Sequence, residues 1–144
     1  MSRRSDMKAS LKRLAIPHLR SIGFRGSFPD FYRYMGDTVE CLQFYFKRDS
    51  SDDRFFVHAG LASRDGVEWH RPIKHTVAPE KVKATQLIAT VRLGAKPGSN
   101  NRWFDFAVQS ADSIALDVVS ELQGDDFWHR LQQVPVTIEG KDFR

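Results

Sequence analysis

The amino-acid sequence predicts an α+β fold, in which an antiparallel sheet of about five strands carries an N-terminal helix and C-terminal helices packed on it. Segments with strand-like alternation are bunched in the middle of the chain, between helical segments at its two ends. The chain contains 11 Phe, and large rings favour strands and contribute much of the burial in a small core. Because helices do not alternate with strands, a parallel βαβ arrangement is not expected.

The length of 144 residues fits one domain. We expect a single domain over residues 1–144, with frayed ends at residues 1–6 and 136–144. Cys41 is the only cysteine, so an internal disulfide is excluded, and its place in an apolar strand predicts a buried side chain. The N-terminus lacks the apolar core of a secretory signal, and no run of about 18 apolar residues occurs. We therefore expect a cytoplasmic protein without a membrane partner.

The first element is predicted as a helix from about residue 5 to residue 22. Apolar side chains recur there at steps of three and four residues, which gives the helix one apolar stripe. Ser5 is the expected N-cap, and Gly23 suits the left-handed conformation that ends many helices. Pro17 has no backbone N–H to donate, so we expect a kink or a helix in two pieces.

Three strands are predicted next, at residues 28–35, 38–47 and 54–61. Each is rich in aromatic or β-branched residues and alternates in polarity. The turn at residues 36–37 joins the first two strands as an antiparallel hairpin, and the polar turn at residues 49–53 leads into the third. The three strands together form a predicted meander.

Residues 63–86 are predicted to form a long irregular connection, broken by Pro72 and Pro79, with a short helix opening at Pro79. The fourth and fifth strands are expected at residues 87–93 and 102–108, where they would pair as a hairpin across the loop between them. Two helices at residues 110–122 and 126–134 complete the fold; the first has a clear apolar face.

Several short motifs follow one another along the chain. They are Gly23-Phe24, Phe31-Tyr32-Arg33, Gly36-Asp37, Gln43-Phe44, Ala59-Gly60-Leu61, Arg92-Leu93-Gly94 and Trp103-Phe104. Their order and spacing resemble those of the bacterial domain of unknown function family 4304. The resemblance covers residues 7 to about 122, most of the chain. It implies an α+β fold and no established activity, and it supplies no catalytic residue.

His70 and His75 raise the question of a metal site, with Glu68 nearby. Such a site needs three or four converging ligands, and a five-residue spacing across Pro72 does not place both imidazoles on one helix face. Two cations between the histidines also oppose a metal ion. We therefore predict no metal site and no cofactor.

Four residues are candidates for binding a ligand or a partner: Arg33, His58, Arg92 and Trp103. Arg92 and Trp103 are expected near the two roots of the predicted hairpin, where they would form a cation–π contact or frame an anion pocket. The alternative is that Trp103 lies in the core and Arg92 pairs with a surface carboxylate. His58 is interpreted as a general base, or as a residue with a structural hydrogen bond or solvent exposure. Arg33 belongs to one of the motifs of the resemblance.

The basic residues are concentrated at the start of the chain. Residues 1–36 contain eight basic and two acidic residues, or +6, whereas the whole chain carries +4. One interpretation is that the first helix contacts phosphates through Lys8, Lys12, Arg13 and Arg20. The other is that these side chains form the solvated face of an amphipathic helix.

The leading functional hypothesis is a non-enzymatic module that binds another protein or a small ligand, as immunity partners of toxins do. The first alternative is a nucleic-acid-associated protein that uses the basic N-terminal quarter. The second is a hydrolase or transferase built around Arg92 and His58. The sequence predicts no particular oligomeric state.

Overall fold

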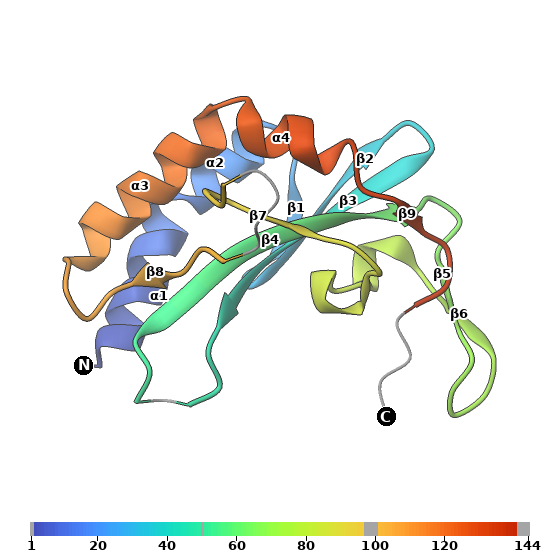
Figure 1. The fold of residues 1–144 in the computed structure, drawn as a ribbon, viewed down its shortest axis with the longest axis horizontal. Coiled ribbons are helices and arrows are strands. Elements are labelled where there is room, and N and C mark those ends of the chain that lie inside the picture. Colours follow the sequence, from blue (N-terminus) through green and yellow to red (C-terminus); the bar gives the residue numbers. More distant parts are fainter. Residues whose placement is uncertain (1, 50, 97–100, 141–144) are drawn as a thin grey trace.

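An antiparallel sheet lies at the centre of the computed structural model, which describes residues 2–49, 51–96 and 101–140 (Figure 1). Its strands are β1 (Arg25–Ser27), β2 (Asp30–Met35), β3 (Thr38–Phe46), β4 (Arg54–Ser63), β7 (Val91–Arg92), β8 (Phe104–Asp105) and β9 (Val136–Thr137). Five strands pair in the order β1-β2-β3-β4-β7, and β8 and β9 also pair with β4. All these pairs are antiparallel except β4–β9.

The helices lie on one face of this sheet, here called the helix face (Figure 1). They are α1 (Arg3–Leu14), α2 (Ile16–Ser21), α3 (Ala111–Gln123) and α4 (Asp126–Leu131). The opposite face, here called the open face, is covered at one end by two short 3-10 helices, η1 (Pro79–Lys81) and η2 (Ala84–Gln86). The predicted α+β fold, with an antiparallel sheet and helices at both ends of the chain, is confirmed.

The N-terminal helix forms in two pieces, as predicted from Pro17. α2 has Pro17 in its first turn, where a missing backbone N–H costs no hydrogen bond. The predicted N-cap is wrong, because the helix begins one turn earlier. Ser2 is the N-cap, and its hydroxyl accepts a hydrogen bond from the backbone N–H of Ser5. Gly23 ends α2 with a φ of 101°, and Phe24 N donates back to Leu19 O, as predicted.

The predicted meander forms the centre of the sheet. β2 pairs with β3 until Asp30 meets Gln43, and β3 pairs with β4 over its whole length. Residues 44–46 of β3 therefore extend beyond β2. β1 is an additional edge strand that the sequence pattern does not predict, because its three residues are neither aromatic nor β-branched.

Three short strands cover, one after another, the edge of β4 that faces away from β3. β8 pairs with residues 54–55 of β4, β7 with residues 58–59 and β9 with residues 61–62. The predicted hairpin between residues 87–93 and 102–108 is therefore wrong. The two segments pair with the same edge of β4 and not with each other.

Gly60 explains why the segment before β7 is not a full strand. A Cβ atom at this position would lie 2.5 Å from Ala89 O and 2.6 Å from Leu87 Cδ1. The segment before Val91 thus crosses the open face of β4 above Gly60, and only its end turns into the sheet. The absence of a side chain in the middle of β4 permits this close approach.

The predicted irregular connection contains regular structure. β5 (Val67–Trp69) and β6 (His75–Val77) form a separate two-stranded sheet, and η1 opens at Pro79 as predicted. The C-terminal segment returns beside β5, where Glu68 and Glu139 form a parallel bridge. The ends that the sequence predicts to be frayed thus include parts of α1 and β9; residues 1 and 141–144 lie outside the described residues.

Two hydrophobic clusters enclose the sheet. The larger lies between the helix face and the helices and includes Leu11, Phe44 and Val118. The smaller lies under η1 and η2 and includes Cys41, which is buried as predicted. In the described part of the chain, no helix is both long enough and apolar enough to cross a membrane.

Candidate functional site

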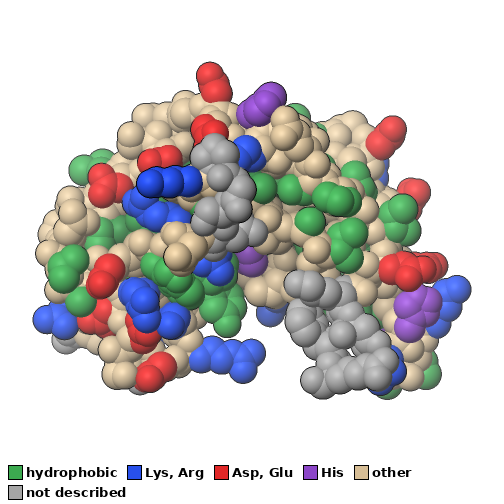
Figure 2. Space-filling view, viewed as in Figure 1, with side chains coloured by type: hydrophobic (Ala, Val, Ile, Leu, Met, Phe, Trp, Pro, Cys, Tyr) green, Lys and Arg blue, Asp and Glu red, His purple; other side chains and the backbone are tan. Residues whose placement is uncertain are grey.

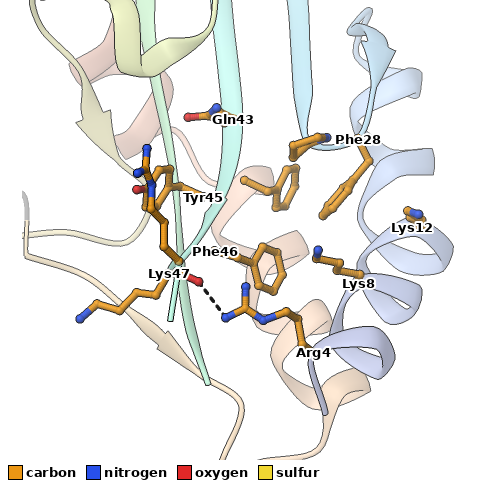
Figure 3. A pocket seen from close by; sticks show the side chains of 11 residues that line it. Arg4, Lys8, Lys12, Phe28, Gln43, Tyr45, Phe46 and Lys47 are labelled. Carbon is orange, nitrogen blue, oxygen red and sulfur yellow. Dashed lines mark hydrogen bonds between the residues drawn. The ribbon is translucent and has the colours of Figure 1, made fainter. Parts of the chain in front are cut away.

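A pocket of about 500 Å³ opens at the end of β3, beside α1 (Figure 3). It is called the basic pocket below, and it is lined by Arg4, Lys8, Lys12, Phe28, Pro29, Gln43, Phe44, Tyr45, Phe46, Lys47 and Arg48. The strand pairing explains its position. Because residues 44–46 extend beyond β2, this edge of β3 faces the side chains of α1 and not another strand.

The charge of the pocket lining has one sign. Five of the eleven lining residues are basic and none is acidic. Lys8 Nζ lies 5.2 Å from the centroid of the Phe46 ring, and Lys12 Nζ lies 5.5 Å from that of Phe28. Figure 3 shows Lys8 reaching from the helix toward the Phe46 ring. Several cations beside apolar walls concentrate positive potential in the cleft between them.

Arg4 has a structural role in addition to its charge. Its Nη2 donates hydrogen bonds to three carbonyl oxygens near the β3–β4 turn, those of Lys47 at 2.7 Å, Asp49 at 3.0 Å and Asp52 at 3.2 Å. Its Nε is buried and has no hydrogen-bond partner among the described residues. Arg4 therefore fixes α1 against the strand end that forms the opposite wall of the pocket.

The four predicted phosphate contacts separate into two pairs. Lys8 and Lys12 line the basic pocket, and neither takes part in a salt bridge between described residues. Arg13 points elsewhere and forms an ion pair with Asp112. Arg20 donates from Nη2 to the carbonyl oxygen of Gly26 at 2.7 Å. The structure thus brings two of the four side chains to the pocket.

A row of polar side chains crosses the open face beside the pocket. Asp30, Gln43, His58 and Arg92 are successive partners in the registers of β2, β3, β4 and β7. Gln43 Nε2 donates to Asp30 Oδ1 at 2.9 Å, so the carbonyl oxygen of Gln43 faces His58 Nε2, also at 2.9 Å. His58 Nε2 therefore carries a proton and donates it to this bond. The buried His58 has the structural hydrogen bond that one interpretation of the sequence predicted.

Trp103 is the centre of a second cluster on the open face, the Trp103 cluster, formed with Phe56, Arg92, Lys47 and Arg54. The ring of Trp103 meets that of Phe56 edge to face at 5.0 Å. The Arg92 guanidinium lies 3.7 Å from the centroid of Phe56 and 5.0 Å from that of Trp103. The predicted contact between Arg92 and Trp103 therefore exists, although the predicted hairpin does not. Trp103 is half-buried, and Arg92 forms no salt bridge with a described carboxylate.

The basic pocket and the Trp103 cluster are in contact. Lys47 lines the pocket, and its Nζ lies 4.9 Å from the Trp103 ring. Tyr45 also lines the pocket, and its ring stacks on Phe56 at 4.9 Å. Figure 3 shows Tyr45 and Lys47 on the opposite side of β3 from Phe46. Basic and aromatic side chains therefore continue around the end of β3, from α1 to the open face.

Arg33, the remaining candidate, lies on the helix face. Its Nε donates to Glu40 Oε1 at 2.6 Å, and its Nη1 donates to the carbonyl oxygen of Ile22 at 2.8 Å. The guanidinium also lies over the rings of Phe24 and Trp128. These contacts tie β2 to the helices, and they do not bring Arg33 to His58, Arg92 or Trp103.

A comparison with protein-family models shows which family the chain belongs to. The model described as Domain of unknown function (DUF4304) matches residues 15–133. The chain belongs to this family. No curated protein and no solved structure matches the chain. The DUF4304 match includes the strand side of the basic pocket and the Trp103 cluster, whereas Arg4, Lys8 and Lys12 precede it.

The cations of this DUF4304 domain differ in their counter-ions. Hydrogen bonds from Arg54 and Lys47 lower the pKa of Asp52 to about 2, so this carboxylate is ionised near neutral pH and forms a salt bridge with each of them. Burial lowers the pKa of Arg92, because the charged guanidinium loses contact with water. Arg92 is therefore the cation of the Trp103 cluster that gains most from an external anion.

Sequence reasoning did not find several residues of the pocket in this DUF4304 chain. Arg4 lay in a segment predicted to be frayed, and Arg48 lay next to a polar turn. One sequence signal was present, since Arg4, Lys8 and Lys12 follow at intervals of four residues and share one side of a helix. Phe28 and Phe46 line the pocket only because of where β2 ends, and a sequence pattern does not specify that position.

Proposed function

We propose that this domain is a non-enzymatic binding module, and that its ligand carries a negatively charged group that enters the basic pocket. The observation that supports the proposal most is the lining itself, with five basic residues and no acidic one. Lys8 and Lys12 have no carboxylate partner among the described residues. An anion between them would relieve the repulsion of neighbouring like charges without breaking an existing salt bridge.

The rings of the pocket indicate what else the ligand contains. Phe28 and Phe46 are half-buried, so part of each ring remains accessible beside the lysines. A ligand with a planar or apolar part would bury this surface while its charged group contacts Lys8 and Lys12. A volume of about 500 Å³ suits a molecule of the size of a mononucleotide.

Calorimetric titration with adenosine monophosphate and with adenosine tests the proposal. The monophosphate should bind, and adenosine, which lacks the charge, should bind much more weakly. The double variant Lys8→Gln/Lys12→Gln should lose about tenfold in affinity for the monophosphate. The matched control is Arg13→Gln/Arg20→Gln, which removes the same charge from α1 and α2 outside the pocket and should bind as the wild type does.

Equal losses in the two double variants would mean that net charge, and not the pocket, attracts the anion. Equal binding of adenosine and its monophosphate would remove the basis for an anionic ligand. Either result would count against the proposal.

A single-stranded nucleic acid is a second candidate ligand, supported by the contact between the pocket and the Trp103 cluster. Proteins that bind single strands combine a basic groove with rings on which bases stack. Tyr45, Phe56 and Trp103 would supply the rings, and Arg92 a further phosphate contact. In this case Arg92→Gln should weaken the binding of an oligonucleotide and leave that of the mononucleotide unchanged.

Three further expectations from the sequence stay predictions. These are a protein partner of the kind that an immunity protein has, a cytoplasmic location and the hydrolase or transferase alternative. The enzymatic alternative requires His58 to reach a substrate, and His58 is only 5% exposed.

A further inference from the structure

Glu68, His70 and Glu139 converge at the end of the molecule opposite the basic pocket, beside β5. The ligand atoms of the three side chains, one per residue, all lie within 4.8 Å of one another. Glu68 and His70 are two residues apart in an extended segment, so their side chains point to the same side. Glu139 comes from the C-terminal segment. An imidazole and two carboxylates thus meet on one small surface.

The backbone holds the two glutamates next to each other. Glu68 and Glu139 are partners in a parallel bridge, in which Glu68 N donates to Ile138 O at 2.9 Å and Gly140 N donates to Glu68 O at 2.8 Å. Gly140 packs against the Trp69 ring so closely that a Cβ atom there would lie 2.6 Å from Trp69 Cζ2. The backbone positions of Glu68 and Glu139 therefore follow from a fixed pairing of the two segments.

Glu68 and Glu139 carry charges of the same sign. Like charges on directly opposed strand residues destabilise a sheet. His70 Nε2 lies 3.6 Å from Glu139 Oε2, which is longer than a hydrogen bond. Two ligand atoms on one tetrahedral zinc ion, each about 2.0–2.1 Å from the metal, are about 3.3 Å apart. A small side-chain rotation would therefore give the spacing that a shared metal ion requires.

We propose that Glu68, His70 and Glu139 bind one divalent transition-metal ion. An imidazole with two carboxylates suits zinc and its neighbours in the first transition series better than magnesium or calcium, which prefer oxygen ligands alone. Three protein ligands leave one tetrahedral position for water. The sequence-based prediction of no metal site considered His70 together with His75. In the structure, the side chain that lies near Glu68 and His70 is that of Glu139 and not that of His75. Glu139 lies 69 residues after His70 in the chain.

Calorimetric titration of the untagged 144-residue chain with Zn²⁺ tests this inference. The wild type should bind one Zn²⁺ per chain with micromolar affinity, since Arg71 and Lys74 follow closely in the chain and oppose a cation. His70→Ala and Glu139→Gln should each weaken binding by at least about tenfold. His75→Ala is the matched control, because it removes an exposed histidine from the same hairpin but outside the cluster, and it should change the affinity less than about twofold.

The substituted side chains are exposed, so circular dichroism should show an unchanged fold for every variant. Equal zinc binding by the wild type and His70→Ala would overturn the proposal, because it would place the ion elsewhere. The absence of binding at about 100 µM Zn²⁺ would overturn it as well.

Discussion

At the scale of single residues, the carboxylate of Glu40 stands out because it is fully buried on the helix face. Its two carboxylate oxygens accept hydrogen bonds from Arg33 Nε at 2.6 Å and Gln132 Nε2 at 2.7 Å. A buried carboxylate is tolerated only with such partners. Arg33 therefore stabilises the fold by keeping Glu40 paired.

Replacement of Arg33 by Ala should lower the free energy of unfolding by about 3 kcal/mol, because a buried charge loses its partner. Urea denaturation would measure the loss. Arg13→Ala is a suitable comparison, since its partner Asp112 is exposed, and it should cost less than about 1 kcal/mol. The account of Arg33 would fail if the two variants were equally stable.

The buried Cys41 should be chemically inert in the folded protein. Burial raises the pKa of its thiol from an ordinary value of 9.0 to about 12, so almost no reactive thiolate is present at pH 8. A chromogenic disulfide reagent should react with Cys41 in urea and not in buffer. Rapid labelling of the native protein would contradict this prediction.

The raised pKa of Cys41 also makes the free energy of unfolding depend on pH. The unfolded chain loses the thiol proton at a lower pH than the folded protein does. The stabilising contribution of the protonated thiol should therefore be complete below about pH 9 and decline as pH rises toward 12.

At the scale of elements, the crossing of residues 87–90 over β4 depends on Gly60. Gly60→Ala should destabilise the protein by about 1–3 kcal/mol, because backbone at Ala89 must move. Gly124→Ala is the control, since a Cβ there would lie 3.6 Å from its nearest neighbour at Glu121, an ordinary contact. Thermal denaturation should separate the two variants clearly, and equal melting temperatures would argue against the crossing.

Local chemistry explains which elements the sequence could predict. The break near Pro17 and the turn at Gly36 were predictable, because proline lacks a donor and glycine permits the φ of 62° found there. β7 and β8 were predicted as one long hairpin, because residues 87–93 and 102–108 have strand-like composition. Their actual partner, the free edge of β4, is a tertiary feature that local alternation does not encode.

At the scale of the whole molecule, the two candidate surfaces are assembled from distant parts of the chain. Figure 2 shows that the lower edge of the molecule is hollowed, with Lys and Arg side chains along one side of the hollow. The pairing of Arg92 with Phe56 and the convergence of Glu68 with Glu139 both require the chain to return to β4 or β5. Residue types predicted candidates such as Arg92 and Trp103, but long-range pairing determined which of them meet.

The return of the C-terminus also predicts a contribution to stability. Thr137 is fully buried, and its hydroxyl accepts a hydrogen bond from Ile88 N at 3.1 Å. Deletion of residues 136–144 should therefore speed hydrogen exchange at Leu61 and Ala62, the partners of β9 in β4. Exchange rates unchanged at these amides would show that β9 adds nothing to the sheet.

Mapping of backbone amide shifts by nuclear magnetic resonance, during titration with adenosine monophosphate, tests the central claim most directly. The account predicts that the largest shifts fall on residues 43–48 and on Lys8 and Lys12, and that they disappear in the Lys8→Gln/Lys12→Gln variant. Shifts that are absent, or that fall mainly on parts of the chain remote from the end of β3, would contradict the claim that the basic pocket binds an anion.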